Sequence, residues 1–364
     1  MRICFIGNGL CSHLFKFVKW FSRRGHDVYL FSPFMVDIAG VKTFLVEGNF
    51  IYLPKKISMV KSLVKKVNPD IVHAHYIVTS GILGAFSDFH PFVVSPWGSD
   101  VFVDPKESIF KNIFVRYALK KADFVSGLGD NMVNNLIRLG CDKKKIIPLR
   151  ISVVDTTLFN HPHKDISMSK DDFVVVNSRP SLDIYHLDVF IKAIPLVVKK
   201  ISNIKFVIFL RPSLKLYNNK ILSLIKKLNI NKFVICKDFI PNSDMPVFLK
   251  AVDLFVDSIV SPHSMRDESF TDMNAGIGTS ALEAMSSGIP VLLGNKNPVV
   301  GHPYMTYYPL DYQDMADKII EILNNKKIRD ILTAQGRRFV INHADINRCL
   351  LEWEAFYERC INNS

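Results

Sequence analysis

The chain has 364 residues, 48% of them hydrophobic and 22% charged, which excludes a disordered protein and leaves room for two domains of about 150–200 residues. No apolar run reaches the roughly 18 residues of a membrane-spanning helix, and the start MRICFIGNG lacks the pattern of a signal peptide. Six cysteines without paired spacing favour reduced thiols in a cytoplasm. The net charge of +12 is uneven: residues 1–155 carry 21 Lys and Arg against 12 Asp and Glu, which indicates an anionic partner.

The first half of the chain alternates apolar runs with helical periodicity, which is typical of a parallel, doubly wound sheet. We expect strands at 2–7, 26–31, 71–75, 92–95, 124–126 and 145–149, and helices at 12–24, 53–68, 109–122 and 130–139. The turn Gly7-Asn8-Gly9 predicts a loop that approaches a phosphate. An NAD enzyme is disfavoured, because the second strand ends at Ser32-Pro33 without the acid that would hold an adenosine ribose.

The stretch 155–172 breaks this alternation, because it is polar and has no periodicity. We interpret it as a linker, and its two histidines, His161 and His163, as solvated residues and not metal ligands. A second α/β pattern then begins. Its expected strands are 173–177, 205–210, 233–236, 254–257 and 291–294, and its expected helices are 187–200, 217–228, 244–250, 311–323, 328–341 and 349–360. Two such domains predict a ligand cleft between them.

The segment 276–290, GIGTSALEAMSSGIP, predicts a short helix with Thr279 and Ser280 as capping residues and Gly288 at its end. Its amino end directs N–H groups and the positive end of the helix dipole toward Gly278, which makes an anion site. Glu283 lies one turn into the helix, where its carboxylate can accept hydrogen bonds from sugar hydroxyls.

Five phrases carry a resemblance that covers nearly the whole chain: PDIVHAH (69–75), VVSPWGSDVF (93–102), the run 174–194, the run 236–258 and ALEAMSSGIPVL (281–292). With them the chain resembles the GT-B glycosyltransferases, specifically the retaining family 4, in a branch with a Trp-Gly-Ser-Asp motif. The resemblance implies two Rossmann-like α/β domains with parallel sheets that face a central cleft. It places an acceptor domain at 1–158, a linker at 159–172, a donor domain at 173–340 and, at 341–364, a helix that returns to the first domain.

The resemblance also implies a site for a UDP- or GDP-type sugar donor, with no cofactor. In it, Glu283 matches the clamp on the donor ribose, and Arg179 matches the arginine on the donor diphosphate. The loop Gly278–Ser280, which includes Thr279, matches the backbone that meets the phosphates. Gly7 and Gly9 match the loop of the first domain that approaches the reacting centre.

Three positions depart from the family pattern. Ala275 replaces the first glutamate of the E-x7-E motif, Tyr185-His186 replaces a lysine, and Trp97 replaces a histidine at the end of the fourth strand. As substitutes for the missing lysine we name the cations Arg211 and Lys215. As substitutes for the missing glutamate we name the acids Asp267, Glu268 and Asp272.

Two further residues are catalytic candidates in the first domain. His73 and His75 alternate along one strand, so both imidazoles face the same way. His75, nearer the carboxyl end of the strand, is either an acceptor contact or acid–base group, or a histidine bonded within the domain. Asp100 lies close to Trp97 and is the second candidate.

The expected reaction is retaining transfer of a sugar to a hydroxyl of a glycan or lipid-linked acceptor, in cell-surface polysaccharide or lipopolysaccharide synthesis. No metal is expected, because no DxD motif lies at a strand end. The basic helices 15–24, 60–67 and 109–121 predict a cytoplasmic protein bound peripherally to an anionic membrane, and not to nucleic acid. Two alternatives stay open: an inactive GT-B partner or regulatory subunit, and a nucleotide-sugar 2-epimerase.

Overall fold

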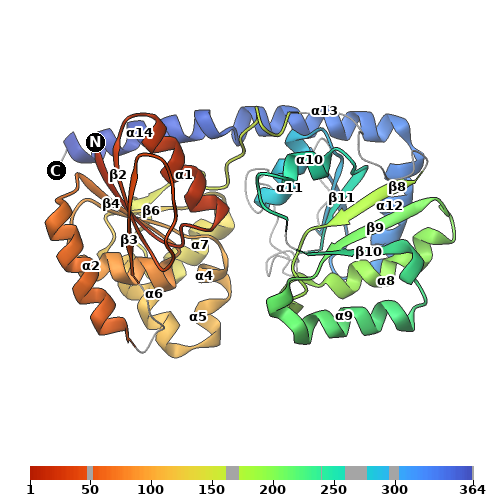
Figure 1. The fold of residues 1–364 in the computed structure, drawn as a ribbon, viewed down its shortest axis with the longest axis horizontal. Helices are drawn as coiled ribbons and strands as arrows, with labels where there is room; N and C mark the ends of the chain where they lie inside the picture. Colours follow the sequence, from red (N-terminus) through yellow and green to blue (C-terminus); the bar gives the residue numbers. More distant parts are fainter. Residues whose placement is uncertain (47–51, 161–171, 239, 259–276, 295–302, 363–364) are drawn as a thin grey trace. The chain divides into compact units, whose positions relative to one another are not determined.

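The structure, a computed structural model, describes residues 1–46, 52–160, 172–238, 240–258, 277–294 and 303–362 (Figure 1). The chain divides into two compact units. The first comprises Met1–Val153 and Ile346–Ser364, and the second comprises Val154–Asp345. No helix in the described ranges has the length and apolar character needed to cross a membrane.

The first unit is built on a parallel seven-stranded sheet in the order β3-β2-β1-β4-β5-β6-β7. Its strands are β1 Arg2–Ile6, β2 Asp27–Ser32, β3 Val41–Leu45, β4 Ile71–His75, β5 Phe92–Ser95, β6 Phe124–Ser126 and β7 Ile146–Ile147. Its helices are α1 Ser12–Arg23, α2 Leu53–Val67, α3 Ile82–Ser87, α4 Ser99–Phe102, α5 Asp104–Glu107, α6 Ile109–Lys121, α7 Asp130–Arg138 and α14 Ile346–Asn362. The predicted strands and long helices are confirmed, whereas β3 and the short helices α3, α4 and α5 were not predicted.

Helices cover both faces of this sheet, which is why the central strands are buried along their whole length. On one face α1 and α14 enclose a core that contains Phe17, Trp353 and Tyr357. On the other face α2, α3 and α6 pack side by side over Val72 and Val94. The last helix of the chain therefore completes the first unit.

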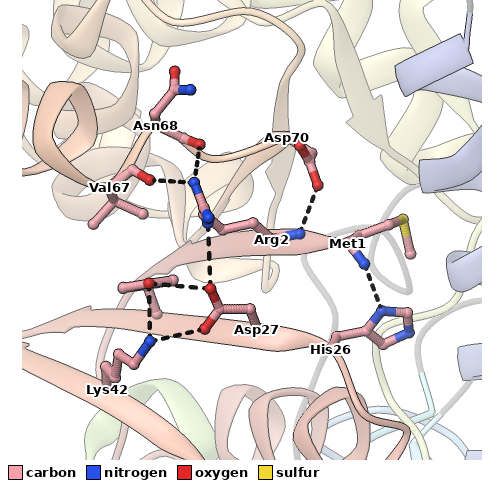
Figure 2. Close-up of polar contacts among 9 residues, drawn as sticks. Met1, Arg2, His26, Asp27, Lys42, Val67, Asn68 and Asp70 are labelled. Atoms are coloured by element: carbon pink, nitrogen blue, oxygen red, sulfur yellow. Dashed lines mark hydrogen bonds and ion pairs between the residues drawn. The ribbon is translucent and has the colours of Figure 1, made fainter.

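Ion pairs and hydrogen bonds hold the amino ends of the first strands together (Figure 2). The Arg2 guanidinium donates to Asp27 on β2 and to the carbonyl oxygens of Val67 and Asn68 at the end of α2. Lys42 on β3 donates to the same Asp27 carboxylate at 3.1 Å. The amino edge of the sheet is thus occupied by internal contacts.

The second unit has a parallel six-stranded sheet in the order β10-β9-β8-β11-β12-β13. Its strands are β8 Phe173–Asn177, β9 Ile204–Phe209, β10 Val234–Lys237, β11 Leu254–Asp257, β12 Val291–Gly294 and β13 Met305–Tyr307. Its helices are α8 Leu187–Val198, α9 Lys215–Lys227, α10 Met245–Leu249, α11 Thr279–Ser286, α12 Tyr312–Asn324 and α13 Lys326–His343. Both units are therefore Rossmann-like, as predicted, and only β13 was not anticipated.

The unit boundaries lie a few residues away from the expected ones. Residues 154–160 belong to the second unit, because the Val154 N–H donates to the carbonyl of Ala344 and Phe159 is buried in the second core. At the other end, α14 enters the first unit at Ile346 and not at 341. The greater part of the expected linker, including His161 and His163, lies outside the described residues.

In each sheet, successive strands are added first toward one edge and then toward the other, so the strand order reverses at one point. A parallel sheet binds ligands beside this reversal point, at its carboxyl edge. In the first sheet the reversal lies between β1 and β4, which end at Ile6 and His75. In the second sheet it lies between β8 and β11, which end at Asn177 and Asp257. Of the predicted site residues, Gly7, Gly9 and His75 lie at the ends of β1 and β4, and Arg179 follows β8, whereas Asp100 follows β5 and Arg211 follows β9.

Candidate functional site

A buried ion pair occupies the reversal point of the second sheet. Arg179, two residues beyond β8, donates from Nε to Asp257 Oδ1 at 2.8 Å and from one Nη to Oδ2 at 2.6 Å. Asp257 is 1% exposed and the Arg179 side chain is 19% exposed. Burial lowers the pKa of Arg179, but the Asp257 carboxylate outweighs it, so the pKa of the guanidinium is raised. Arg179 is consequently a fixed, permanently charged group.

The neighbours of this pair fix its geometry. Asn177 accepts the Arg179 N–H at 3.0 Å and donates to Ser258 at 2.8 Å, and Ser258 donates to the carbonyl of Tyr185. The Tyr185 ring lies 5.3 Å from the guanidinium, within range of a cation–π contact. An aromatic ring thus contacts Arg179 from the position where the family pattern has a lysine.

The amino end of α11 meets the same guanidinium. A Cβ on Gly278 would collide with an Nη atom of Arg179 and would lie 3.5 Å from Asp257 Oδ2, so only glycine permits this approach. Gly278 itself is the N-cap and carries no capping side chain, which corrects the expectation that Thr279 and Ser280 cap the helix. The structure therefore brings Arg179 against Gly278, and Thr279 and Ser280 are the first two residues of the helix that begins there.

Glu283 lies on the second turn of α11 and is buried, with 5% of its surface exposed. Its Oε1 accepts a hydrogen bond from the Asn242 amide at 3.1 Å. Asn242 belongs to the loop between β10 and α10, so this loop and α11 together position the carboxylate. A carboxylate held in this way is suited to accept hydrogen bonds from vicinal hydroxyls.

The two substitute cations lie at the end of β9. The Arg211 carbonyl accepts from Asn218 at 2.8 Å, and Asn218 in turn accepts from Ser181 in the Arg179 loop. Arg211 and Lys215 are both exposed. The backbone that carries Arg211 is therefore tied to the loop that carries Arg179. The proposed acids Asp267, Glu268 and Asp272, together with Ala275, lie outside the described residues.

The glycine loop of the first unit lies at the reversal point of its own sheet. A Cβ on Gly7 would lie 3.4 Å from both Cβ and the carbonyl oxygen of His75, and would overlap Leu14. Gly9 donates to Ser32 at 3.2 Å, and a Cβ there would press on Leu30. The structure thus places Gly7 beside His75 at one strand end, and side chains larger than glycine would displace the loop.

The two histidines of β4 face the same way, as predicted, but both are 0% exposed. Their rings lie 4.2 Å apart, and the ring of His73 stacks on Trp353 of α14. His73 bonds to Tyr357 and to Ser95, which lies at 2.7 Å. Burial lowers the pKa of His75 to about 3, with a further contribution from His13, so the imidazole is neutral at neutral pH.

His75 keeps one polar atom without a partner. The Trp97 indole donates to His75 Nδ1 at 3.4 Å, so the neutral ring carries its proton on Nε2. Within the described ranges that Nε2 has no hydrogen-bond partner. Because this buried donor has no partner, His75 stays a candidate for contact with a substrate oxygen.

Asp100 is fully buried and engaged by the backbone. Its carboxylate accepts from the N–H groups of Ile77, Trp97 and Gly98 at 2.8–2.9 Å. Burial raises the pKa of Asp100 to about 6, and these N–H donors oppose that rise. Asp100 therefore links the Trp97-Gly98 turn to Ile77, which lies two residues after β4.

We therefore expect Asp100→Ala to unfold the first unit more readily. The change leaves three buried N–H groups without acceptors, each of which costs about 1–3 kcal/mol. Thermal unfolding checks this, with Asp37→Ala, an exposed aspartate of the same unit, as the matched control. A variant with normal stability and lost turnover would instead make Asp100 a catalytic group.

Two residues of the site were not predicted from the sequence. Asp257 could have been recognised from the sequence, because it is a charged residue at the end of the buried strand LFVD. Asn242 could not, since a polar residue after a strand is typical of any loop. Within the described ranges, no group of three or more His, Cys, Asp or Glu side chains is arranged to hold a metal ion.

Comparison with known families assigns both halves of the chain. Residues 2–126 match the family described as glycosyl transferase 4-like, and residues 163–339 match glycosyl transferases group 1. An uncharacterized glycosyltransferase of Methanocaldococcus jannaschii is 22% identical over 304 residues, which covers 79% of this chain and 75% of the relative.

Solved structures share the fold over the whole chain. The sucrose-phosphate synthase of Thermosynechococcus elongatus has a TM-score of 0.83 at 15% identity, with 100% of each chain covered. Anabaena HepE, crystallised with UDP and glucose, has a TM-score of 0.77 at 14% identity, with 99% of this chain and 100% of that chain covered. Together with the two family matches, these similarities identify the chain as a glycosyltransferase of the GT-B fold.

Proposed function

We propose that the protein transfers a sugar from a nucleotide-diphosphate donor, of the UDP or GDP type, to a hydroxyl with retention of anomeric configuration. One observation carries the proposal: the Arg179 guanidinium is fixed beside the amino end of α11 at the reversal point of the second sheet. Both groups present positive charge to the same place, where a diphosphate would lie. The structure of HepE with UDP and glucose supports a UDP-type donor for a chain of this fold.

The chemistry follows from the charge that develops on the leaving group. As the anomeric bond breaks, the departing diphosphate gains negative charge, which Arg179 and the α11 N–H groups stabilise without reorganising. The departing phosphate oxygen then accepts the proton of the acceptor hydroxyl, which attacks on the same face of the sugar. Glu283 holds the donor ribose, and no protein-bound metal takes part in this scheme.

The acceptor in this proposal is a glycan or lipid-linked sugar of cell-surface polysaccharide or lipopolysaccharide synthesis, used at the inner face of an anionic membrane. The basic character of the first unit supports this acceptor class. Counted over the two units, the first has 23 Lys and Arg against 14 Asp and Glu, and the second has 23 against 20.

The test is a panel of nucleotide sugars screened by thermal shift, followed by nucleotide release and NMR of the product. A bound donor raises the melting temperature in proportion to its affinity. We expect one UDP- or GDP-sugar to stand out, release that continues in EDTA, and a product with the donor's anomeric configuration. Inverted product, or an epimerised nucleotide sugar without transfer, would overturn the proposal.

Glu283→Gln is expected to weaken donor binding by about 10- to 100-fold, because hydrogen bonds to a charged group contribute about 1.5–3 kcal/mol. Glutamine keeps the oxygen that accepts from Asn242, so the helix position is preserved. Donor titration by calorimetry measures the change, with Glu321→Gln on the exposed side of α12 as the matched control. Equal donor affinity in both variants would remove Glu283 from the ribose site.

A further inference from the structure

Two buried side-chain atoms in the part of the chain that the structure describes have no hydrogen-bond partner. They are Nε2 of His75 and Oγ of Ser178. His75 ends β4 and Ser178 directly follows β8, so each residue lies beside the reversal point of its own sheet, at the carboxyl edge. Folded proteins pair nearly all buried polar groups, so an unpaired one at the edge where a parallel sheet binds ligands indicates a contact with the ligand.

The register of two strands shows what lies next to Ser178. The strands β8 and β11 are parallel neighbours, and Phe255 lies opposite Val176. Two residues farther along, the same register sets Asp257 opposite Ser178. Opposed residues of adjacent parallel strands point to the same face of the sheet, so the Ser178 hydroxyl shares a face with the carboxylate that binds Arg179.

The face that Ser178 shares with Asp257 is the one that α11 covers. Val176 belongs to the core that also contains Ala281 of α11. Since side chains alternate along an extended strand, Ser178 is on the side of Val176. The same side carries the Asp257 carboxylate, because its Oδ2 would lie 3.5 Å from a Cβ on Gly278. Ser178 is therefore placed at the amino end of α11.

The chemistry of this corner favours an anionic partner for the hydroxyl. The two Asp257 oxygens already accept from Nε and one Nη of Arg179, at 2.8 and 2.6 Å. The amide oxygen of Asn177 likewise accepts from the Arg179 N–H. A serine hydroxyl can donate one hydrogen bond, and the amino end of a helix attracts an acceptor that carries negative charge.

We propose that Ser178 Oγ donates a hydrogen bond to a phosphate oxygen of the sugar donor, which makes Ser178 a further binding residue beside Arg179. This inference deepens the proposed function and rests on it, since it takes the donor to be a nucleotide-diphosphate sugar. The hydroxyl adds no charge to the site. It is a neutral second donor in a place where an aromatic ring, that of Tyr185, and not a lysine accompanies the guanidinium.

Ser178→Ala separates this role from a structural one. Alanine removes only the hydroxyl, which loses no hydrogen bond among the described residues. Without nucleotide we therefore expect an unchanged or higher melting temperature, because a buried unpaired polar group is replaced by a methyl group. The affinity for UDP or GDP should fall by about 10- to 100-fold, the effect of one hydrogen bond to a charged group. Thermal unfolding and calorimetric titration of the full-length protein with UDP and with GDP measure the two effects.

Ser286→Ala is the matched control, because Ser286 is a buried serine at the other end of α11 that donates to the Phe159 carbonyl at 2.9 Å. This variant should show the reverse pattern, a lower melting temperature with an unchanged affinity for the nucleotide. If Ser178→Ala lost stability as Ser286→Ala does, the hydroxyl would have a structural role and the inference would be overturned. An unchanged nucleotide affinity in Ser178→Ala would overturn it too, and is the result expected if the hydroxyl binds only water.

Arg179→Gln, titrated in the same way, distinguishes failure here from failure of the proposed function. If Arg179→Gln weakens nucleotide binding and Ser178→Ala does not, the inference is wrong and the proposed function stands. If neither change affects binding, the diphosphate does not lie beside this ion pair, and both are wrong. An unaltered protein that binds neither UDP nor GDP would also overturn both.

Discussion

Replacing Arg179 with glutamine is expected to lower kcat/KM for sugar transfer by about 10²- to 10³-fold, the loss seen when one preorganised donor to a developing anion is removed. The reason is geometric. Asp257 binds Nε and one Nη of the guanidinium, and this same Nη lies beside Gly278 at the amino end of α11, so a change of the side chain alters both contacts. Arg179→Lys keeps the charge but loses the fork, so an intermediate loss is expected.

Steady-state kinetics with the donor found in the panel measures this effect, below the melting temperature of each variant. Arg338→Gln, an exposed arginine of the same unit, is the matched control and should retain full activity. The rise in melting temperature caused by UDP should also shrink in Arg179→Gln. If the folded glutamine variant turns over normally and responds to UDP as before, Arg179 does not bind the diphosphate.

The repeating fold was predictable because its signals are local. Apolar runs of four to six residues and the glycines that end helices lie within single elements, and they placed most strands and helices of both sheets. The short strand β3, VKTFL, was missed because four of its residues are only half-buried and one is exposed, so it lacks a continuous apolar run. The element containing Glu283 was predictable for the same local reason, since a glycine and a proline mark its end.

The surroundings of the site residues were not predictable, because they depend on contacts between distant segments. Alternation along β4 predicts that His73 and His75 share a side, but His73 is covered by Trp353 and Tyr357 of the last helix, and His75 packs on Phe17 of α1. In the same way, Asp257 pairs with Arg179 across 78 positions of sequence. Asp257 lies within the run 236–258 that resembles the family, but the resemblance gave this residue no role.

Asp257→Asn is expected to destabilise the second unit by about 3–5 kcal/mol, the cost of leaving one partner of a buried ion pair without the other. Asparagine would still accept from Arg179 Nε, but its amide would oppose the Nη group that now donates at 2.6 Å. The free energy of unfolding, measured with urea, checks the expected loss. As the matched control, Asp330→Asn breaks the Lys326 pair, whose side chains are 80% and 60% exposed, and should change stability little.

The double variant tests whether Arg179 and Asp257 stabilise the protein as a coupled pair or independently of each other. If the two side chains act as one unit, the combination of Arg179→Gln with Asp257→Asn should cost less than the sum of the single changes, because neither charge is then left alone. Additive losses would show instead that Asp257 stabilises the strand end independently of Arg179. Asp257 fixes the guanidinium that is expected to meet the diphosphate. A coupled pair therefore predicts that Asp257→Asn alone raises the KM for the donor, although Asp257 itself is too deeply buried to touch the donor.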